Sequence, residues 1–388
     1  MEPPLPRSLF PVTERWAYLN HAGVAPLPSS AVEAMAGYAS RIAGGGSLAV
    51  EGHNQRAEEI RQVSARLLGV PERDVAFVKN TTEGLGFVAN GLDWQPGDRV
   101  VVPDLEFPST LYPWLALRDR GVVVDLVVPQ GPGRTLATEA FAEVIARGVP
   151  PKVVATSWVQ FGRGWRTDLG ALARVCHDAG ALLCADVIQG LGVIPSELEA
   201  WGVDFATADA HKWLLGPEGI GVLYVAGRCL DRLRPLEPGW NSVVHRQQWD
   251  DRELVWDAGA RRLEGGSHNQ AGLHALGASL DLLAGAGIDD VWRHVDELCD
   301  RACAGLAGVG ARVLSDRSVA GRSGVVTFSV AGHDPAAVHR HLLEAGIVTS
   351  PRGGGVRLAP HAYNTAEEID ALVAQVGQLC GGAGGTAR

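Results

Sequence analysis

The chain has 388 residues, of which 46% are hydrophobic and 20% are charged. This composition is typical of a globular enzyme and excludes a disordered chain or a small disulfide-stapled scaffold. Lysine and arginine total 34 against 44 aspartates and glutamates, so the formal net charge is −10. An acidic chain is unsuited to general binding of nucleic acid or of an anionic membrane. Lysine occurs only at positions 79, 152 and 212, which leaves three candidates for a catalytic amine.

The six cysteines are scattered and form no CxxC pair. We therefore expect reduced thiols in a cytoplasmic protein and no metal site. The N-terminal residues lack the apolar core of a signal peptide, and no run of about 18 apolar residues predicts a membrane span.

The predicted elements begin with two helices, at residues 29–42 and, capped by Asn54, at residues 54–69. From residue 76 onward, short apolar strands alternate with helices. The predicted strands cover residues 76–79, 99–104, 121–129, 152–159, 181–187, 204–210 and 221–226. Four helices are predicted between them: one beginning at Thr81, one after Pro108, and two at residues 138–147 and 169–179. This pattern predicts an α/β fold with a largely parallel sheet covered on both faces. Such a sheet binds ligands beyond the carboxyl ends of its strands.

Beyond residue 270 the pattern changes to that of a smaller α+β domain. Helices are predicted at residues 271–283, 289–306 and 335–345 and from Thr365, and strands at residues 311–314 and 324–330 and in a segment ending at Arg357. We predict a large domain at residues 18–269 and a small domain formed by residues 1–17 and 270–388.

Three motifs contain residues suited to catalysis or to binding a cofactor. Lys212 follows a predicted strand in ADAHKWLLGPEG, where partial desolvation would lower the pKa of its amine and favour a Schiff base; an ordinary loop lysine is the alternative. Asp186 ends a strand in CADVIQGLG and can pair with a pyridinium nitrogen or cap a helix. The turn at residues 80–84 (NTTEG) suits a phosphate, although such turns are also common caps.

Together these motifs resemble the class V aminotransferase family, which includes cysteine desulfurases, selenocysteine lyases, kynureninase and isopenicillin N epimerase. The resemblance extends from residues 18–23 (YLNHAG) to residues 363–370 (YNTAEEID). It implies pyridoxal phosphate fold type I, with a mainly parallel seven-stranded sheet in the large domain and an α+β C-terminal domain.

The resemblance also implies a cofactor, pyridoxal 5′-phosphate (PLP), and a role for each matching residue. Lys212 corresponds to the lysine that binds the cofactor covalently, and Asp186 to the partner of its pyridine nitrogen. Further cofactor-binding roles fall on Thr81, Thr82, Phe107, Gln160, Gln189, His211 and Ser267, and substrate-binding roles on Arg357, Arg352 and His21. The match at Ser267 implies a homodimer with shared active sites, because this position reaches the phosphate held by the other subunit.

The sequence departs from the desulfurases in three ways. Residues 349–357 (TSPRGGGVR) contain no cysteine where those enzymes carry a catalytic one, and Phe107 replaces their ring-stacking histidine. Asp209 replaces a serine that often helps to hold the phosphate. Since an anion beside a phosphate is unfavourable, we expect Asp209 to point elsewhere or to act through water, for example on His211.

These observations favour an enzyme that acts on an α-amino acid or amino-acid conjugate through an external aldimine. Transamination and β-elimination of the C–S lyase type are the preferred reactions. Epimerisation or racemisation, decarboxylation, and PLP binding without turnover remain open. Isopenicillin N epimerase-like members often serve secondary metabolism, so such a role also remains open.

Overall fold

The computed structural model describes residues 2–129 and 135–382. Its largest feature is a seven-stranded sheet with the strand order β2, β8, β7, β6, β5, β3, β4. These strands are β2 (Val75–Val78), β3 (Arg99–Pro103), β4 (Val123–Val127), β5 (Val153–Ser157), β6 (Leu182–Asp186), β7 (Phe205–Asp209) and β8 (Gly221–Val225). Within this sheet β8 runs antiparallel to both neighbours, and the other pairings are parallel. The predicted α/β class with a mainly parallel seven-stranded sheet is confirmed.

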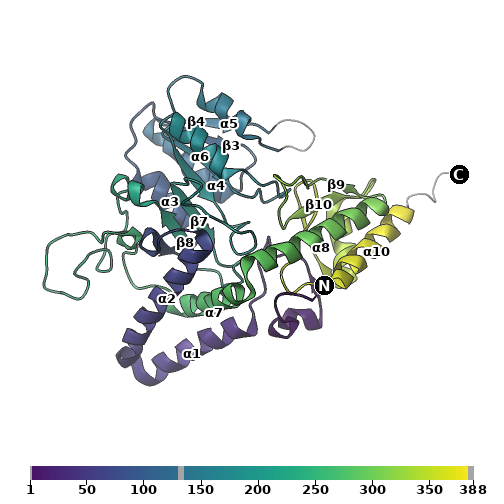
Figure 1. Cartoon of the computed structure of the whole chain (residues 1–388), viewed down its shortest axis with the longest axis horizontal. Coiled ribbons are helices and arrows are strands. Elements are labelled where there is room, and N and C mark those ends of the chain that lie inside the picture. The colour runs from purple at the N-terminus through teal and green to yellow at the C-terminus, as the bar shows by residue number, and fades with distance from the viewer. Residues whose placement is uncertain (1, 130–134, 383–388) are drawn as a thin grey trace.

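Helices pack around this sheet (Figure 1). They are α3 (Thr81–Gly91), α4 (Pro108–Ala116), α5 (Thr138–Ile145) and α6 (Leu169–Asp178), close to their predicted positions. Every residue of β2, β3 and β5 to β8 is buried, which explains why most residues of these strands are apolar on both faces of the sheet. Helix α3 approaches β7 so closely that a Cβ on Gly84 would lie 2.3 Å from Thr207 Oγ1, so this contact requires glycine.

Three further helices pack together below the sheet in Figure 1: α1 (Ser29–Gly45), α2 (Val50–Leu68) and α7 (Gln270–Ala286). The prediction that Asn54 caps the second helix is wrong. A 3₁₀ turn at Gly46–Ala49 runs directly into α2, which begins at Val50. The backbone at Ala49 is already helical, so no side-chain cap is needed at Asn54.

The C-terminal part contains a four-stranded antiparallel sheet with the order β12, β13, β10, β9. Its elements are β9 (Arg312–Val313), β10 (Val326–Ser329), β12 (Ser350–Arg352) and β13 (Gly355–Leu358), with α8 (Ile288–Gly308), α9 (Pro335–Glu344) and α10 (Ala366–Gly382). The short strands β1 (Ala17–Tyr18) and β11 (Ile347–Val348) pair in parallel, so the N-terminal segment lies against this part of the chain (Figure 1).

Helices α7 and α8 meet at Gly287, whose positive φ of 80° ends α7 and turns the chain. In the described part of the chain no single helix is long and apolar enough to cross a membrane. Helices α7 and α8 meet the criteria of length and composition only as a pair, and they are bent by 81° at their junction.

Candidate active site

A cavity of about 470 Å³ lies where the carboxyl ends of β5, β6 and β7 face the β12–β13 hairpin. Parallel strands end at one edge of a sheet, so polar residues that follow different strands converge there. The structure brings nine of the predicted site residues to the wall of this cavity: Thr81, Thr82, Phe107, Asp186, Gln189, His211, Lys212, Arg352 and Arg357. None of the six cysteines lines it.

Lys212 lies in the turn after β7 and is 9% exposed. Its carbonyl accepts from the N–H of Leu215, whose φ of 57° is unusual for a residue other than glycine. The Leu215 carbonyl in turn accepts a 2.7 Å hydrogen bond from Ser279 Oγ on α7, which holds the strained turn in place. Burial lowers the pKa of the Lys212 amine to about 8; Asp186 opposes this shift and Arg357 adds to it.

Asp186 lies at the end of β6 and is 3% exposed. Its Oδ2 accepts a 2.7 Å hydrogen bond from Thr110 Oγ1, and its Oδ1 accepts one of 3.0 Å from the Ile188 N–H. Burial raises the pKa of Asp186, and these two hydrogen bonds and Lys212 act against the shift. The two donors fix the carboxylate in one orientation, and a cationic N–H in the cavity would compensate its buried charge.

Gln189 is held in one amide orientation. Its Oε1 accepts a 2.9 Å hydrogen bond from Trp213 Nε1, which can only donate. Its Nε2 donates to the Ala22 carbonyl at 3.0 Å. An amide nitrogen carries two N–H groups, so one donor remains for a group in the cavity.

The N-terminus of α3 forms another part of the wall. Thr82 Oγ1 donates to Ser109 Oγ at 2.8 Å, and Thr81 Oγ1 accepts from the Asp209 N–H at 3.0 Å. Asp209 Oδ1 lies 2.9 Å from His211 Nδ1, an ion-pair distance, although the two atoms do not complete a hydrogen bond. The carboxylate of Asp209 thus lies against His211. This contact agrees with the expectation that Asp209, which replaces a serine, acts on His211 and does not itself bind the phosphate.

Arg357 projects from β13 and is 4% exposed. Its Nη1 donates to the Phe161 carbonyl at 2.5 Å, and its Nη2 lies 3.4 Å from Asn20 Oδ1. Its Nε is buried and has no partner in the described structure. Burial, with the nearby Arg352 guanidinium as the second cause, lowers the pKa of Arg357 to about 10. An anion in the cavity would relieve both the missing hydrogen bond and the buried charge.

Two predicted site residues are buried beside the cavity without lining it. Gln160 was expected beside the cofactor ring, but its Oε1 accepts from the N–H groups of Gly162 and Arg163 at 2.8 and 2.7 Å. Its Nε2 donates to the Leu105 carbonyl at 3.0 Å. These three hydrogen bonds turn the amide into the protein.

His21, expected to contact the substrate, is fully buried. Its Nδ1 lies 2.8 Å from the Ala359 carbonyl and its Nε2 lies 2.8 Å from the Tyr363 hydroxyl. A carbonyl only accepts, so Nδ1 carries the proton and Tyr363 donates to Nε2. Burial lowers the pKa of His21, which keeps the ring neutral. The structure therefore favours a structural role in which His21 fixes the N-terminal segment.

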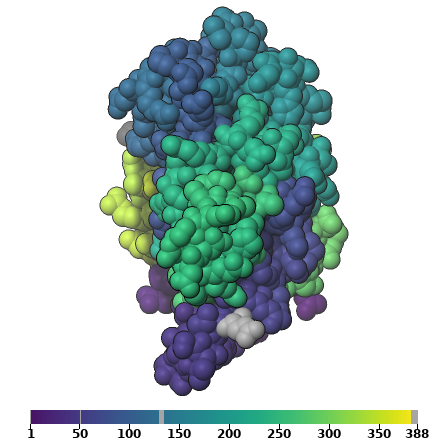
Figure 2. All heavy atoms as spheres, turned by 90° about the vertical axis from the view of Figure 1, so that its left-hand side faces the viewer, coloured from purple at the N-terminus to yellow at the C-terminus, as the bar shows by residue number. Residues whose placement is uncertain are grey.

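Ser267 does not line the Lys212 cavity in its own chain. It lines a separate hollow of about 860 Å³ bordered by α1, α2 and the irregular segment before η7 (Ala260–Leu263). That segment contains the exposed aromatic side chains Trp240 and Trp249, whose ring centroids are 5.8 Å apart. Figure 2 shows this region of the chain, in green, standing forward on the face turned to the viewer.

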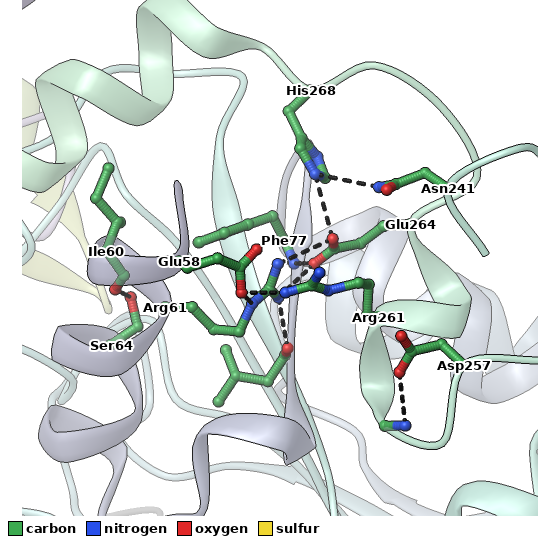
Figure 3. A network of polar contacts seen from close by, with 12 residues as sticks. Glu58, Ile60, Arg61, Ser64, Phe77, Asn241, Asp257, Arg261, Glu264 and His268 are labelled. Carbon is green, nitrogen blue, oxygen red and sulfur yellow. Dashed lines mark hydrogen bonds and ion pairs between the residues drawn. The ribbon is translucent and has the colours of Figure 1, made fainter. Parts of the chain in front are cut away.

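A buried ionic network anchors the chain just before Ser267. Arg61 of α2 makes a bidentate pair with Glu264, with distances of 2.6 Å (Nη1–Oε1) and 3.0 Å (Nη2–Oε2). The Phe77 N–H donates to Glu264 Oε1 at 2.7 Å, and His268 Nε2 lies 3.2 Å from Oε2. Figure 3 shows these groups converging on Glu264. Although burial alone would raise it, the pKa of Glu264 is held well below its usual range by Arg61 and His268, so the carboxylate stays charged and rigid.

Four functional side chains were missed by the sequence reasoning. Thr110 orients Asp186, Asn20 contacts Arg357, Ser109 contacts Thr82, and Glu106 accepts from the Ser157 N–H at 2.7 Å. Asn20 lies within YLNHAG, and Glu106, Ser109 and Thr110 lie within three residues of Phe107. The sequence still does not reveal that Thr110 contacts Asp186, because only the packing of α4 against the sheet brings the two side chains together.

The cavity wall fits PLP. The donor Arg357 Nε is buried in this wall without a partner in the described structure, and it can pair with an anionic oxygen. Phe107 offers a ring face, and its centroid lies 5.6 Å from Lys212 Nζ. The cavity volume lies within the usual range for a cofactor and a small substrate.

Comparison with known proteins agrees with this geometry. The sequence profile of Aminotransferase class-V matches residues 17–372. A "Probable cysteine desulfurase" of Methanothermobacter thermautotrophicus is 30% identical over 395 residues, which cover 96% of each chain. An "Uncharacterized aminotransferase YcbU" of Bacillus subtilis is 28% identical over 94% of each chain. The apo cysteine desulfurase from Thermococcus onnurineus NA1 has a TM-score of 0.87 and 26% identity, with 97% of each chain covered.

The fold and the site define an enzyme that depends on pyridoxal phosphate. The chain belongs to the class V aminotransferase family.

Proposed function

We propose that the protein catalyses β-elimination from a cysteine-type amino acid or amino-acid conjugate, as a C–S lyase without a protein thiol. The relatives described as cysteine desulfurases support chemistry at a carbon–sulfur bond. The observation that carries the proposal is the combination of Lys212, Asp186 and Arg357 in one cavity that no cysteine lines. A reaction that transfers sulfur to a protein thiol has no acceptor there.

In this proposal the large domain holds the cofactor. Thr81, Thr82 and the N-terminus of α3 bind the phosphate together with His211, since free N–H groups and a helix dipole favour an anion. Asp186 pairs with the pyridine nitrogen, and Gln189 offers its remaining N–H to the ring oxygen.

The small domain holds the substrate. Arg357 has its Nε–H and a second Nη2–H available for the substrate α-carboxylate, which two parallel N–H donors can bind in a fork. Phe107 forms an apolar wall beside the reacting centre and cannot exchange protons. Its ring meets the ring of Phe161 edge to face, with 5.4 Å between centroids.

Bound PLP supplies the electron sink for the bond that breaks at Cα. Lys212 Nζ takes the proton from Cα, for which an amine with a pKa of about 8 is suited near neutral pH. The leaving group departs from Cβ with its bonding electrons, and a Cα=Cβ bond forms. Overall, an S-substituted cysteine and one water molecule give a thiol, pyruvate and ammonium, with no oxidant or amino-group acceptor consumed.

The test is turnover of S-substituted cysteines by the holoenzyme in the absence of any keto acid. We expect pyruvate, ammonium and the free thiol in equal amounts. Turnover that starts only when a keto acid is added would establish transamination instead. Alanine formed from cysteine would establish desulfuration. Solvent deuterium at Cα of the recovered amino acid, with no keto acid formed, would establish epimerisation.

We also propose that the working protein is a homodimer in which Ser267 of each chain completes the phosphate site of the other. The support is the position of Ser267, which lies outside its own Lys212 cavity on a turn held rigid by Glu264. Exposed apolar side chains on the neighbouring segment, including Trp240, Trp249 and Leu254, offer contact area to a second copy.

A further inference from the structure

The β12–β13 hairpin carries two arginines on one face. Ser350 pairs with Arg357 and Arg352 pairs with Gly355 in the antiparallel register. Residues two apart on a strand share a face, as do residues directly opposite each other. Ser350, Arg352 and Arg357 accordingly all line the Lys212 cavity.

The hairpin backbone is rigid. Gly353 and Gly354 form its two-residue turn with φ values of 66° and 81°, the conformation that fixes the register of a tight hairpin. Arg163 Nε donates to the Gly353 carbonyl at 3.0 Å, and a Cβ at Gly353 would lie 2.4 Å from the Gly162 carbonyl oxygen. Arg352 is therefore presented to the cavity from a fixed position.

The two arginines differ in burial and in the hydrogen-bond donors that each has available for a ligand. Arg357 is buried and retains a free Nε edge, which suffices for one carboxylate. Arg352 is exposed, and in the described structure its side chain bonds only to the Pro351 carbonyl and forms no ion pair. A second guanidinium with no counterion lies at the mouth of the same cavity.

No acidic side chain of the cavity wall is free to neutralise Arg352. The two acidic residues of this wall are Asp186 and Asp209. Asp186 is bound by Thr110 and the Ile188 N–H, and Asp209 lies against His211. The small-domain side of the cavity thus has two positive charges and no negative one.

We propose that Arg352 binds a second anionic group at the far end of the substrate side chain, so that the enzyme selects amino acids with an acidic side chain. This inference rests on the proposed function, since it takes Arg357 as the site of the α-carboxylate. The favoured substrates are cysteine conjugates whose sulfur substituent ends in a carboxylate. A neutral amide of the same shape would lose the contact with Arg352 and keep every other contact.

The test uses two cysteine conjugates of equal size, S-carboxymethyl-L-cysteine and S-carbamoylmethyl-L-cysteine. Binding to the holoenzyme is followed by the change in cofactor absorption, and turnover is followed by pyruvate release. We expect the acid to bind about tenfold more tightly than the amide, as for a charge-assisted hydrogen bond at a partly exposed site. The variant Arg352→Gln should bring this ratio close to one by weakening only the acid. Arg352→Lys should retain part of the preference, and Arg312→Gln, an exposed arginine on β9, should retain all of it.

Two results would overturn the inference. Wild-type enzyme with equal affinity for both conjugates would show that no second anion is recognised. Equal losses for acid and amide in Arg352→Gln would show that Arg352 instead shares the α-carboxylate with Arg357. A tenfold binding preference without pyruvate release would support the acidic side-chain site and contradict β-elimination, so the two proposals fail separately.

Discussion

The backbone carbonyl of Phe161 accepts a 2.5 Å hydrogen bond from Arg357 Nη1, although the two residues are 196 positions apart. This contact joins the turn after β5 in the large sheet to β13 of the small one. Thr327 Oγ1 of β10 strengthens the same junction by donating to the Gly162 carbonyl at 2.7 Å. The position of Arg357, to which we assign the substrate α-carboxylate, therefore depends on the geometry of the 161–164 turn.

Gln160 should control this geometry as a positioning residue. The variant Gln160→Ala removes three hydrogen bonds, to the Leu105 carbonyl and from the N–H groups of Gly162 and Arg163. We expect KM for amino-acid substrates to rise about tenfold, with a smaller change in kcat, because the arginine fork loses its alignment. Binding of an amine without the α-carboxylate should not change.

The control is Gln378→Ala, an exposed glutamine on α10. If Gln160→Ala weakened the amine and the amino acid equally, Gln160 would act on the cofactor or the reacting centre, as the family resemblance first implied.

The rate at which the apoenzyme takes up PLP should report the state of Lys212. Only the neutral amine attacks the aldehyde, and burial lowers the pKa of Lys212 to about 8. Stopped-flow absorption after mixing with PLP should show a rate that rises with pH and levels off just above pH 8. An ordinary exposed lysine, with a pKa near 10.4, would give a rate still rising at pH 10, and that profile would contradict the assignment.

Glu106 should make stability depend on pH. Burial raises the pKa of its carboxyl group from 4.5 to about 7, and its hydrogen bonds with Ser157 only partly offset this. The folded state then binds more protons than the unfolded state between these values. The contribution of Glu106 to stability is complete below about pH 4.5 and is lost as the pH rises through about 7.

The variant Glu106→Gln removes this titration and keeps an acceptor for the Ser157 N–H. In urea unfolding, the wild type should lose about 2–3 kcal/mol relative to the variant between pH 5 and pH 8. The exposed Glu143→Gln should run parallel to the wild type. Parallel curves for Glu106→Gln as well would mean that the carboxyl group is already ionised at pH 5.

Shared active sites can be tested by complementation. Lys212→Ala and Ser267→Asp should each be inactive, the first through loss of the amine and the second through repulsion of the phosphate in the other subunit. After unfolding and refolding together, mixed dimers contain one site with both residues intact. Random pairing predicts recovery of about a quarter of wild-type activity. Activity no higher than in the separate variants would contradict a site that combines Lys212 of one chain with Ser267 of the other.

The sequence predicted the sheet and the main site residues for the same physical reason. Asp186 and Lys212 follow apolar strands, and parallel strands end at a common edge. Arg357 could be added only through family resemblance, because strands of two to four residues such as β9, β12 and β13 carry too little periodicity to define their register.

Gln160 and His21 do not line the cavity, for a reason that the sequence does not reveal. Both side chains lie near the cavity, yet each is bound by backbone groups of the protein: Gln160 by the Leu105 carbonyl and the Gly162 N–H, and His21 by the Ala359 carbonyl, 338 positions away in the sequence. Which way a polar side chain turns at the end of a strand depends on partners that only the folded chain supplies. Thr110 illustrates the converse, since it is 76 residues from Asp186 and orients that carboxylate through one hydrogen bond.

Reduction of the holoenzyme with borohydride, followed by mass mapping of its peptides, tests directly whether Lys212 binds the cofactor. We expect the loss of the visible absorption of the bound cofactor and a phosphopyridoxyl group on Lys212 alone. Lys79 is exposed and paired with Glu83, and Lys152 is paired with Asp98, so neither should be labelled. Label on either of those residues, or none on Lys212, would contradict the assignment of the active site.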